Sequence, residues 1–294
     1  SPSTTGSEAD VGAALNRSGV RELVHVTPGL PASDGDGVRM TRIIGTPELN
    51  MLDPFLLLDA FGSDQPQDYI GGFPSHPHRG FETVTYLLAG RMRHKDNAGN
   101  EGVIEPGGVQ WMTAGRGIVH SEMPEQENGL LMGFQLWVNL PARAKMTAPA
   151  YQEYPPAGVP LERRDNGTQV RVVAGTTSAG TTGAIRNEWV RPTYLDVSLP
   201  AGLDFEQAVG AGDNAFLYVI DGDLAVGEQQ APLARRTLGI LGAGDRVRVS
   251  AAAAARFLLV SAQPLNEPVA RGGPFVMNTR EEIVQAFDDY RHNR

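Results

Sequence analysis

Residues 71–124 read GGFPSHPHRGFETVTYLLAGRMRHKDNAGNEGVIEPGGVQWMTAGRGIVHSEMP and contain two pairs of metal-binding residue types at one spacing. His76 and His78 form the first pair, and His120 and Glu122 form the second. In a β-strand, residues i and i+2 share a face about 7 Å apart, whereas in a helix they lie on different sides. Strand-favouring residues follow the first pair and precede the second. We therefore expect two strands that bring three imidazoles and one carboxylate around one metal ion.

The other histidines of the chain lack this arrangement. A single histidine in a strand is more often a surface or core residue than a metal ligand. The chain has six histidines, and His25, His94 and His292 have no partner at ligand spacing. We therefore predict that these three are not ligands.

Composition argues against several classes of function. The 294 residues include 34 acidic and 25 basic residues, a net charge of −9, which disfavours direct binding to nucleic acid or to a membrane surface. No apolar run approaches the roughly 20 residues of a membrane-spanning helix, and no apolar secretory segment opens the sequence. The absence of cysteine excludes disulfides, thiolate ligands and a cysteine nucleophile. We take the cytoplasm as the expected compartment.

The spacing of strand and turn signals predicts two similar β-domains. The 35 glycines and 21 prolines suit many short strands joined by tight turns. Residues 86–90 (YLLAG) and 218–222 (YVIDG) each end a strand-like run with a glycine turn, and similar strand and turn signals surround both. This similarity indicates an internal duplication. Residues 121–291 contain no histidine, so the second copy cannot repeat the predicted site.

We expect the chain to divide into five segments in sequence order. Their expected ranges are a flexible N-terminal extension 1–19, an N-terminal metal-binding domain 20–145, a linker 146–168, a C-terminal domain without metal 169–277, and a C-terminal helix and tail 278–294. A short helix is also expected over residues 11–20. The C-terminal helix has a capping box, with Thr279 as the N-cap and Glu282 three residues later. Its expected apolar stripe consists of Ile283, Ala286, Phe287 and Tyr290.

Four motifs, HPHRGFETVTYLLAG, QWMTAGRGIVHSEMP, QLWVNLPARAKM and GPFVMNTREEIVQAFDDYR, resemble the pirins, a family of two-domain cupin proteins. The resemblance extends from about Arg39 to Arg291. It implies an all-β fold of two tandem cupin domains, which are double-stranded β-helices or jelly rolls, followed by a C-terminal helix. By position, it also implies the metal ligands that strand spacing selects, His76, His78, His120 and Glu122.

The donor set restricts the metal without identifying it. Neutral imidazoles and a carboxylate suit Fe(II), Zn, Mn, Ni or Cu. Four protein ligands leave two open positions on an octahedral ion, whereas structural zinc tends to close at four. The resemblance favours Fe(II), because pirins bind iron.

Several pirins resemble flavonol dioxygenases, which implies a mononuclear non-haem iron oxygenase of the quercetin 2,3-dioxygenase type. Such an enzyme opens the ring of a small aromatic, flavonol-like substrate with O2. Glu122 is the expected acceptor of the proton of the substrate's 3-hydroxyl. Glu82 is the second candidate base, since it follows His78 by four residues and is expected on the same strand face. A role of Glu82 as an acceptor for a ligand's N–H fits equally well.

Two other functions remain open from the sequence. Other pirins act as regulators through a partner protein, so the alternative is a metal-dependent regulator that binds a partner enzyme or a transcription factor. In that case turnover would be incidental. A metal-free structural protein with two cupin domains is disfavoured by the four candidate ligands.

Other residues near the two motifs have ordinary structural explanations. Arg79 and Arg116 are expected in solvent-exposed structural roles. The neighbouring apolar residues could line a pocket, although each also fits a plain core: Phe73, Phe81, Trp111, Met112, Met123, Phe134 and Trp137.

Overall fold

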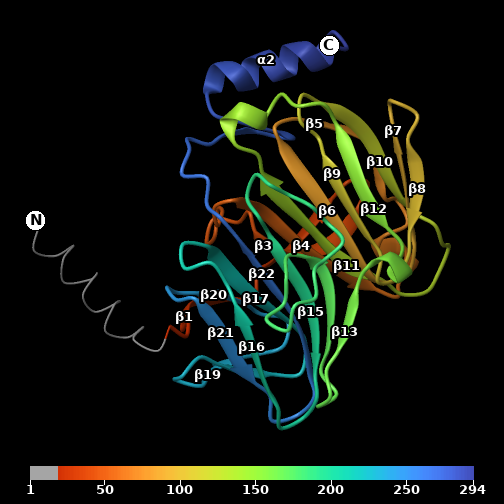
Figure 1. The fold of residues 1–294 in the computed structure, drawn as a ribbon. Coiled ribbons are helices and arrows are strands. Elements are labelled where there is room, and N and C mark those ends of the chain that lie inside the picture. Colours follow the sequence, from red (N-terminus) through yellow and green to blue (C-terminus); the bar gives the residue numbers. More distant parts are fainter. Residues whose placement is uncertain (1–18) are drawn as a thin grey trace, which may run out of the picture. The chain divides into compact units, whose positions relative to one another are not determined.

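The computed structural model describes residues 19–294, which form two compact units (Figure 1). We call residues 29–159 and 265–294 the histidine unit, because it contains the two predicted ligand pairs. The apolar unit consists of the described residues up to Pro28 and residues 160–264. The extension expected over residues 1–19 and the helix expected over residues 11–20 lie almost entirely outside the described residues.

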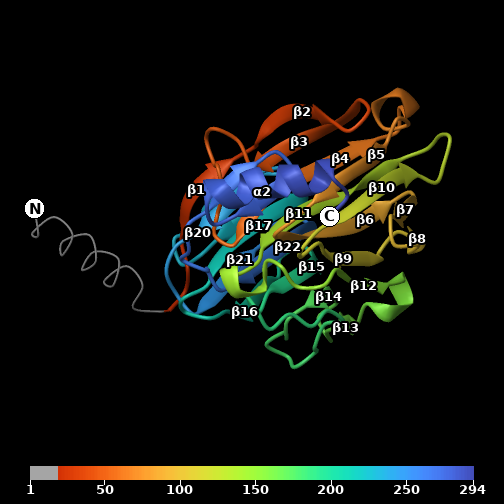
Figure 2. The ribbon, with the colours of Figure 1, turned by 90° about the horizontal axis from the view of Figure 1, so that it is seen from above.

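The histidine unit contains a seven-stranded and a four-stranded antiparallel sheet. The larger sheet has the order β12 (Ala150–Tyr154), β9 (Val109–Thr113), β6 (Phe81–Ala89), β11 (Leu131–Asn139), β4 (Phe55–Ser63), β3 (Val38–Ile44), β2 (Leu30–Asp34). The smaller sheet has the order β5 (Phe73–His78), β10 (Ile118–Pro124), β7 (Met92–Asp96), β8 (Glu101–Ile104), visible as neighbouring strands in Figure 2. Three short 3-10 helices, η1 (Pro66–Asp68), η2 (Ala142–Ala144) and η3 (Pro156–Gly158), join the strands. The predicted strands around both ligand pairs are thus present as β5 and β10.

Side chains from the two sheets of the histidine unit meet in its interior. The Thr85 hydroxyl on β6 donates a hydrogen bond of 3.2 Å to the Glu122 carboxylate on β10. The rings of His78 on β5 and Trp137 on β11 lie 5.5 Å apart, centre to centre. Odd-numbered positions of β6 therefore face the ligand strands, because successive strand residues alternate between the two faces.

The apolar unit repeats this architecture. Its larger sheet has the order β1 (Leu23–Thr27), β20 (Leu238–Leu241), β17 (Asn214–Asp221), β22 (Ala255–Ala262), β15 (Thr193–Leu199), β14 (Gln169–Ala174), β13 (Leu161–Arg163). Its smaller sheet has the order β16 (Asp204–Ala208), β21 (Arg246–Ser250), β18 (Leu224–Val226), β19 (Ala231–Leu233). The orders of the two units match strand for strand, as an internal duplication predicts.

Mainly apolar side chains occupy the positions in the apolar unit that correspond to the ligand strands. Strands β16 and β21 correspond in order to β5 and β10. They place Phe205 opposite Val249 and Gln207 opposite Val247, and Phe205, Val247 and Val249 belong to one buried apolar cluster. Within residues 19–294, the single group of three or more candidate metal ligands lies in the histidine unit.

Strand pairing at both ends of the described chain differs from the expected domain ranges. β1 pairs with β20, so the start of the expected domain 20–145 belongs to the apolar unit; in Figure 1 the red β1 lies beside the blue β20. Residues 265–294 belong to the histidine unit and form β23 (Ala270–Gly272), β24 (Phe275–Met277) and α2 (Arg280–Arg291). The expected linker 146–168 contains β12 and β13, which are part of the two large sheets. Sequence order could not reveal these pairings, because they join segments far apart in the chain.

The predicted C-terminal helix is present as α2 with its capping box. Thr279 accepts a hydrogen bond from the backbone N–H of Glu282, and the Glu282 carboxylate accepts one from the backbone N–H of Thr279. Ile283 and Ala286 are buried, whereas Phe287 is 38% exposed, so the buried stripe is narrower than expected. No described helix is long and apolar enough to cross a membrane.

A buried lysine that no sequence pattern singled out joins the C-terminal segment to the bend after β5. Lys145 is 1% exposed, and its Nζ donates to Gly80 O at 2.8 Å, Asn139 Oδ1 at 2.6 Å and Val276 O at 2.9 Å. Burial lowers the pKa of Lys145 to about 8, so the ammonium keeps its three donors at neutral pH. Gly80 has φ +92°, and a Cβ there would lie 1.9 Å from Val276 O, which explains why the bend needs glycine.

Candidate metal centre

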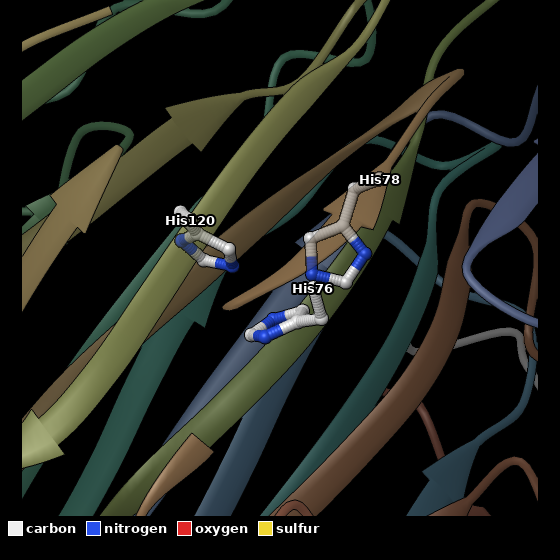
Figure 3. Close-up of side chains that lie close together, drawn as sticks. All are labelled: His76, His78 and His120. Atoms are coloured by element: carbon white, nitrogen blue, oxygen red, sulfur yellow. The ribbon is translucent and has the colours of Figure 1, made fainter. Parts of the chain in front are cut away.

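Three imidazoles converge between the two sheets of the histidine unit (Figure 3). β5 supplies His76 and His78, and β10 supplies His120. His76 lies opposite His120 in the antiparallel pair, and the centres of these two rings are 4.4 Å apart. One candidate ligand nitrogen from each of the three residues lies within 4.8 Å of the other two. The convergence expected from the i, i+2 spacing is therefore present for all three histidines.

The ring nitrogens of this cluster are free to bind a cation. The Nδ1–H of His76 donates to the Pro74 carbonyl at 2.8 Å, which leaves a lone pair on Nε2. His78 and His120 are 3% and 1% exposed, and neither makes a well-formed hydrogen bond through a ring nitrogen within the described residues. Buried polar atoms without partners are costly and rare in proteins. A metal ion bound to these nitrogens would satisfy them, so the residues fit the metal that the sequence predicts.

Burial also keeps two of the rings in the neutral form that binds metals. Burial lowers the pKa of His78 well below its ordinary value, and the neighbouring imidazoles of His120 and His76 add to this effect. Burial likewise lowers the pKa of His120 to about 4, against the opposing influence of the Glu122 carboxylate. Because a metal must displace a proton from a charged imidazole, neutral rings bind it without that competition at neutral pH.

The low pKa of His120 predicts that the metal-free protein loses stability in mild acid. Between pH 6.5, the ordinary value for histidine, and about pH 4, the unfolded chain binds a proton that the folded protein does not. The free energy of unfolding should therefore decrease as the pH falls through this window, by about 3 kcal/mol for His120. Urea unfolding of metal-free protein across pH 4–7 measures this slope. His120→Asn should reduce this slope and leave the part that His78 contributes, whereas the exposed His292→Asn should not change it; equal slopes in all three proteins would contradict the prediction.

Glu122 lies beside the three histidines and is not part of their 4.8 Å group. Its Oε1 is 3.6 Å from His120 Nε2, whereas neighbouring ligand atoms about 2.1 Å from one ion lie about 3 Å apart. The Gln135 amide donates to Glu122 Oε1 at 3.1 Å, and Thr85 donates to Oε2 at 3.2 Å. The indole N–H of Trp137 donates to Gln135 Oε1 at 3.3 Å, which turns the Gln135 NH2 group toward the carboxylate.

The expectation that Glu82 shares a face with His78 is wrong. The bend at Arg79–Gly80 separates β5 from β6, so the alternation of side chains does not continue from one strand to the next. Along β6, Thr85 faces the ligand strands, and Glu82 therefore faces the opposite side of the sheet. There the Glu82 carboxylate accepts a hydrogen bond of 2.6 Å from the Thr113 hydroxyl. Glu82 is thus no candidate for a base at the metal centre.

The cluster of three histidines borders a cavity of about 430 Å³ within the histidine unit, a size typical of small-molecule sites. His76 and His78 line it together with Phe73 and Trp137. Phe73 and Trp137 are two of the seven apolar residues that the sequence suggested could line a pocket, and both do so. Trp111 lies opposite Val84 on the face of the sheet that Glu82 occupies.

Sequence reasoning missed a row of polar side chains on the inner face of the large sheet. Gln110 on β9 lies opposite Thr85 on β6, and Thr85 lies opposite Gln135 on β11. Gln135 lies opposite Asp59 on β4, which is followed by Arg42 on β3. The available signal was a polar residue at an inward position in strands that are otherwise apolar. The row begins at Thr85 and Gln135, which contact Glu122, and ends at Arg42, which lines the cavity.

Other residues that the sequence singled out lie outside the cluster. Arg79 is 6% exposed and forms an ion pair of 2.7 Å with Asp289 of α2, so its expected exposure is wrong; Arg116 is exposed as predicted. His94 is buried on β7, and its Nε2 lies 3.2 Å from a Glu153 carboxylate oxygen. His25, His94 and His292 are absent from the ligand group, in line with the prediction that they are not ligands.

Known proteins resemble this chain along nearly its whole length. The family model described as Pirin matches residues 37–138, and the model described as Pirin C-terminal cupin domain matches residues 194–294. A pirin-like protein of Caulobacter vibrioides is 56% identical over 275 residues, which cover 94% of this chain and 99% of that protein. These matches confirm the resemblance seen in the sequence motifs.

Solved structures share the fold. A quercetin 2,3-dioxygenase from Acinetobacter baumannii superposes with a TM-score of 0.85 at 34% identity, covering 93% of this chain and 97% of that one. A bacterial pirin from Escherichia coli in complex with nickel(II) has a TM-score of 0.63 at 18% identity, covering 80% and 95%. The second likeness shows the fold alone. Together with the two family models, these structures confirm the predicted pair of cupin domains.

Proposed function

Because the chain belongs to the pirin family, we propose that it is a mononuclear non-haem iron protein that opens the ring of a flavonol-like substrate with O2. The observation that carries this proposal is the cluster of three imidazoles, two of which line a cavity of small-molecule size. The likeness to a quercetin 2,3-dioxygenase at 34% identity supports the choice of substrate class.

His76, His78 and His120 would hold the ion, and we propose Glu122 as the fourth ligand. The 3.6 Å between Glu122 Oε1 and His120 Nε2 exceeds the roughly 3 Å between neighbouring ligand atoms of one ion, so the carboxylate would move slightly toward the histidines on binding the ion. Iron is our choice of metal, and other first-row ions bind such a donor set as well. When bound, Fe(II) supplies a Lewis acid for the substrate's oxygen atoms and the electron transfer that O2 chemistry requires.

The chain's own residues would bind the substrate and accept its proton. Trp137 and Phe73 line the cavity and offer aromatic surfaces for a flat ring. Glu122 accepts the proton of the 3-hydroxyl, and the donors of Gln135 and Thr85 fix the direction of its carboxylate. Because Glu122 is 2% exposed, few water molecules compete for this position.

A colorimetric assay tests the proposal. Purified protein loaded anaerobically with Fe(II) should consume quercetin in air, seen as loss of the flavonol's visible absorbance, together with one O2 per substrate at an oxygen electrode. Metal-free protein and Fe(II) alone are the controls, and both should be slower by at least about 100-fold, since enzymes accelerate reactions by far more than this. Equal decay with and without the protein would contradict the enzymatic proposal and favour a metal-dependent regulator that binds a partner protein.

A further inference from the structure

The cavity beside the metal cluster contains a second polar region formed by two arginines. Arg42 and Arg271 both line the cavity, and so does Asp59 of β4. Gln135, which contacts Glu122, lies opposite Asp59, and Asp59 lies opposite Arg42 on the next strand. Two strand spacings separate Gln135 from Arg42, or about 10 Å. A ligand that reaches the metal cluster can therefore also reach this region.

The charge of Arg42 is already neutralised. Its Nε and Nη2 donate to the two carboxylate oxygens of Asp59, both at 2.8 Å. Asp34 accepts a further hydrogen bond of 3.1 Å from the same Nη2. Asp59 is 5% exposed, so this bidentate pair forms a closed and largely desolvated unit. Arg42 thus keeps little capacity to bind an additional anion.

Arg271 carries a charge that no acidic side chain among residues 19–294 neutralises. Its Nη1 donates to the carbonyl oxygens of Leu56 and Asn50, at 3.0 and 3.2 Å. These two bonds use both hydrogens of Nη1 and leave Nη2 and Nε available. The side chain is half-buried at the cavity wall, and burial together with the nearby Arg42 lowers its pKa. An arginine nevertheless stays charged at neutral pH.

We propose that Arg271 is the residue that selects substrates with an anionic group, a carboxylate in particular, on the ring farthest from the metal-binding oxygens. Two carbonyl oxygens hold the guanidinium in place, and its free edge matches the two oxygens of a carboxylate. The proposed function supplies the other end of the substrate, an aromatic 3-hydroxy ketone at the metal cluster, and this inference rests on it. Asp34 also lines the cavity, but its side chain is 57% exposed and is therefore well screened by solvent.

Binding of two matched probes tests this proposal without turnover. The probes are a 3-hydroxyflavone that carries a carboxylate on its pendant phenyl ring and the methyl ester of the same compound. Calorimetry with the full-length Zn(II)-loaded protein should give at least about tenfold tighter binding of the acid, the typical gain from a charge-assisted pair. Arg271→Gln should bring the ratio of the two affinities close to one and change the ester affinity less than about twofold.

Two further variants make the test specific. Arg271→Lys keeps the charge and should retain part of the preference for the acid, even if the loss of the two carbonyl contacts lowers the melting temperature. Arg280→Gln removes an exposed arginine of α2 that does not line the cavity and should leave the ratio unchanged. Equal affinity of wild-type protein for acid and ester, or an unchanged ratio in Arg271→Gln, would overturn the proposal.

The outcomes for substrate selection and for catalysis are separable. A preference for the acid that depends on Arg271, found together with no quercetin turnover by the Fe(II) protein, would reject the proposed enzyme and keep the anion site. Turnover of quercetin with no preference for the acid would reject the anion site and keep the enzyme.

Discussion

Replacing His120 with alanine should reduce bound iron and flavonol turnover by more than about 100-fold. Losing a residue that only hydrogen-bonds to a metal ligand already costs roughly 10- to 100-fold, and loss of a ligand should cost more. The physical reason is that His120 supplies one of three nitrogens within 4.8 Å of one another, on a different strand from the other two. Without it, His76 and His78 offer two ligands from β5 alone. Elemental analysis of protein reconstituted with Fe(II) measures the loss directly.

The same substitution should leave the fold intact. His120 makes no hydrogen bond through its ring nitrogens, so the metal-free protein loses packing on its removal but no hydrogen bond. His94→Gln is the matched control, because His94 is also buried in the small sheet but lies outside the cluster; it should retain its iron. Full iron content in folded His120→Ala would show that the metal binds elsewhere.

Lys145→Met should lower the free energy of unfolding of the histidine unit by about 3–5 kcal/mol, the range for breaking a buried charged contact. The substitution keeps the length of the side chain but removes the Lys145 donor from Gly80 O and Val276 O, and it leaves Asn139 Oδ1 with the Leu140 N–H alone. Each unsatisfied buried acceptor costs about 1–3 kcal/mol. Urea unfolding of the metal-free protein, followed by tryptophan fluorescence, measures the change.

Arg143→Met is the control for Lys145→Met. Arg143 lies two residues earlier in the same segment and is exposed, so its replacement should change the free energy of unfolding by less than about 0.5 kcal/mol. A loss below about 1 kcal/mol in Lys145→Met would mean that water replaces the missing donor. Because Gly80 lies two residues after His78, we also expect weaker iron binding in Lys145→Met than in Arg143→Met.

Local strand geometry was sufficient to predict from sequence that the three histidines converge. His76 and His78, like His120 and Glu122, lie within one strand each, where alternation fixes which side chains share a face. The same rule failed for Glu82, because Gly80 adopts a left-handed conformation between the strands and the alternation starts anew after it.

Contacts between distant segments could not be predicted in this way. Lys145 binds the carbonyl of Val276, 131 residues later, and neither residue belongs to a pattern that indicates pairing. Arg271 likewise reaches the cavity only because β23 packs near the carbonyl of Leu56. The pairing of β1 with β20 depends on which strand edges remain open once both sheets have formed.

The position of Val276 has a consequence for biosynthesis. A ribosome releases the chain from the N-terminus, so β5 and β10 emerge long before Phe275–Met277. Until then the Lys145 ammonium lacks one of its three acceptors, Val276 O, and a fragment that stops at Val159 would lack part of the histidine unit. We therefore expect the bend beside the three histidines to reach its final form only after residues 275–277 have left the exit tunnel.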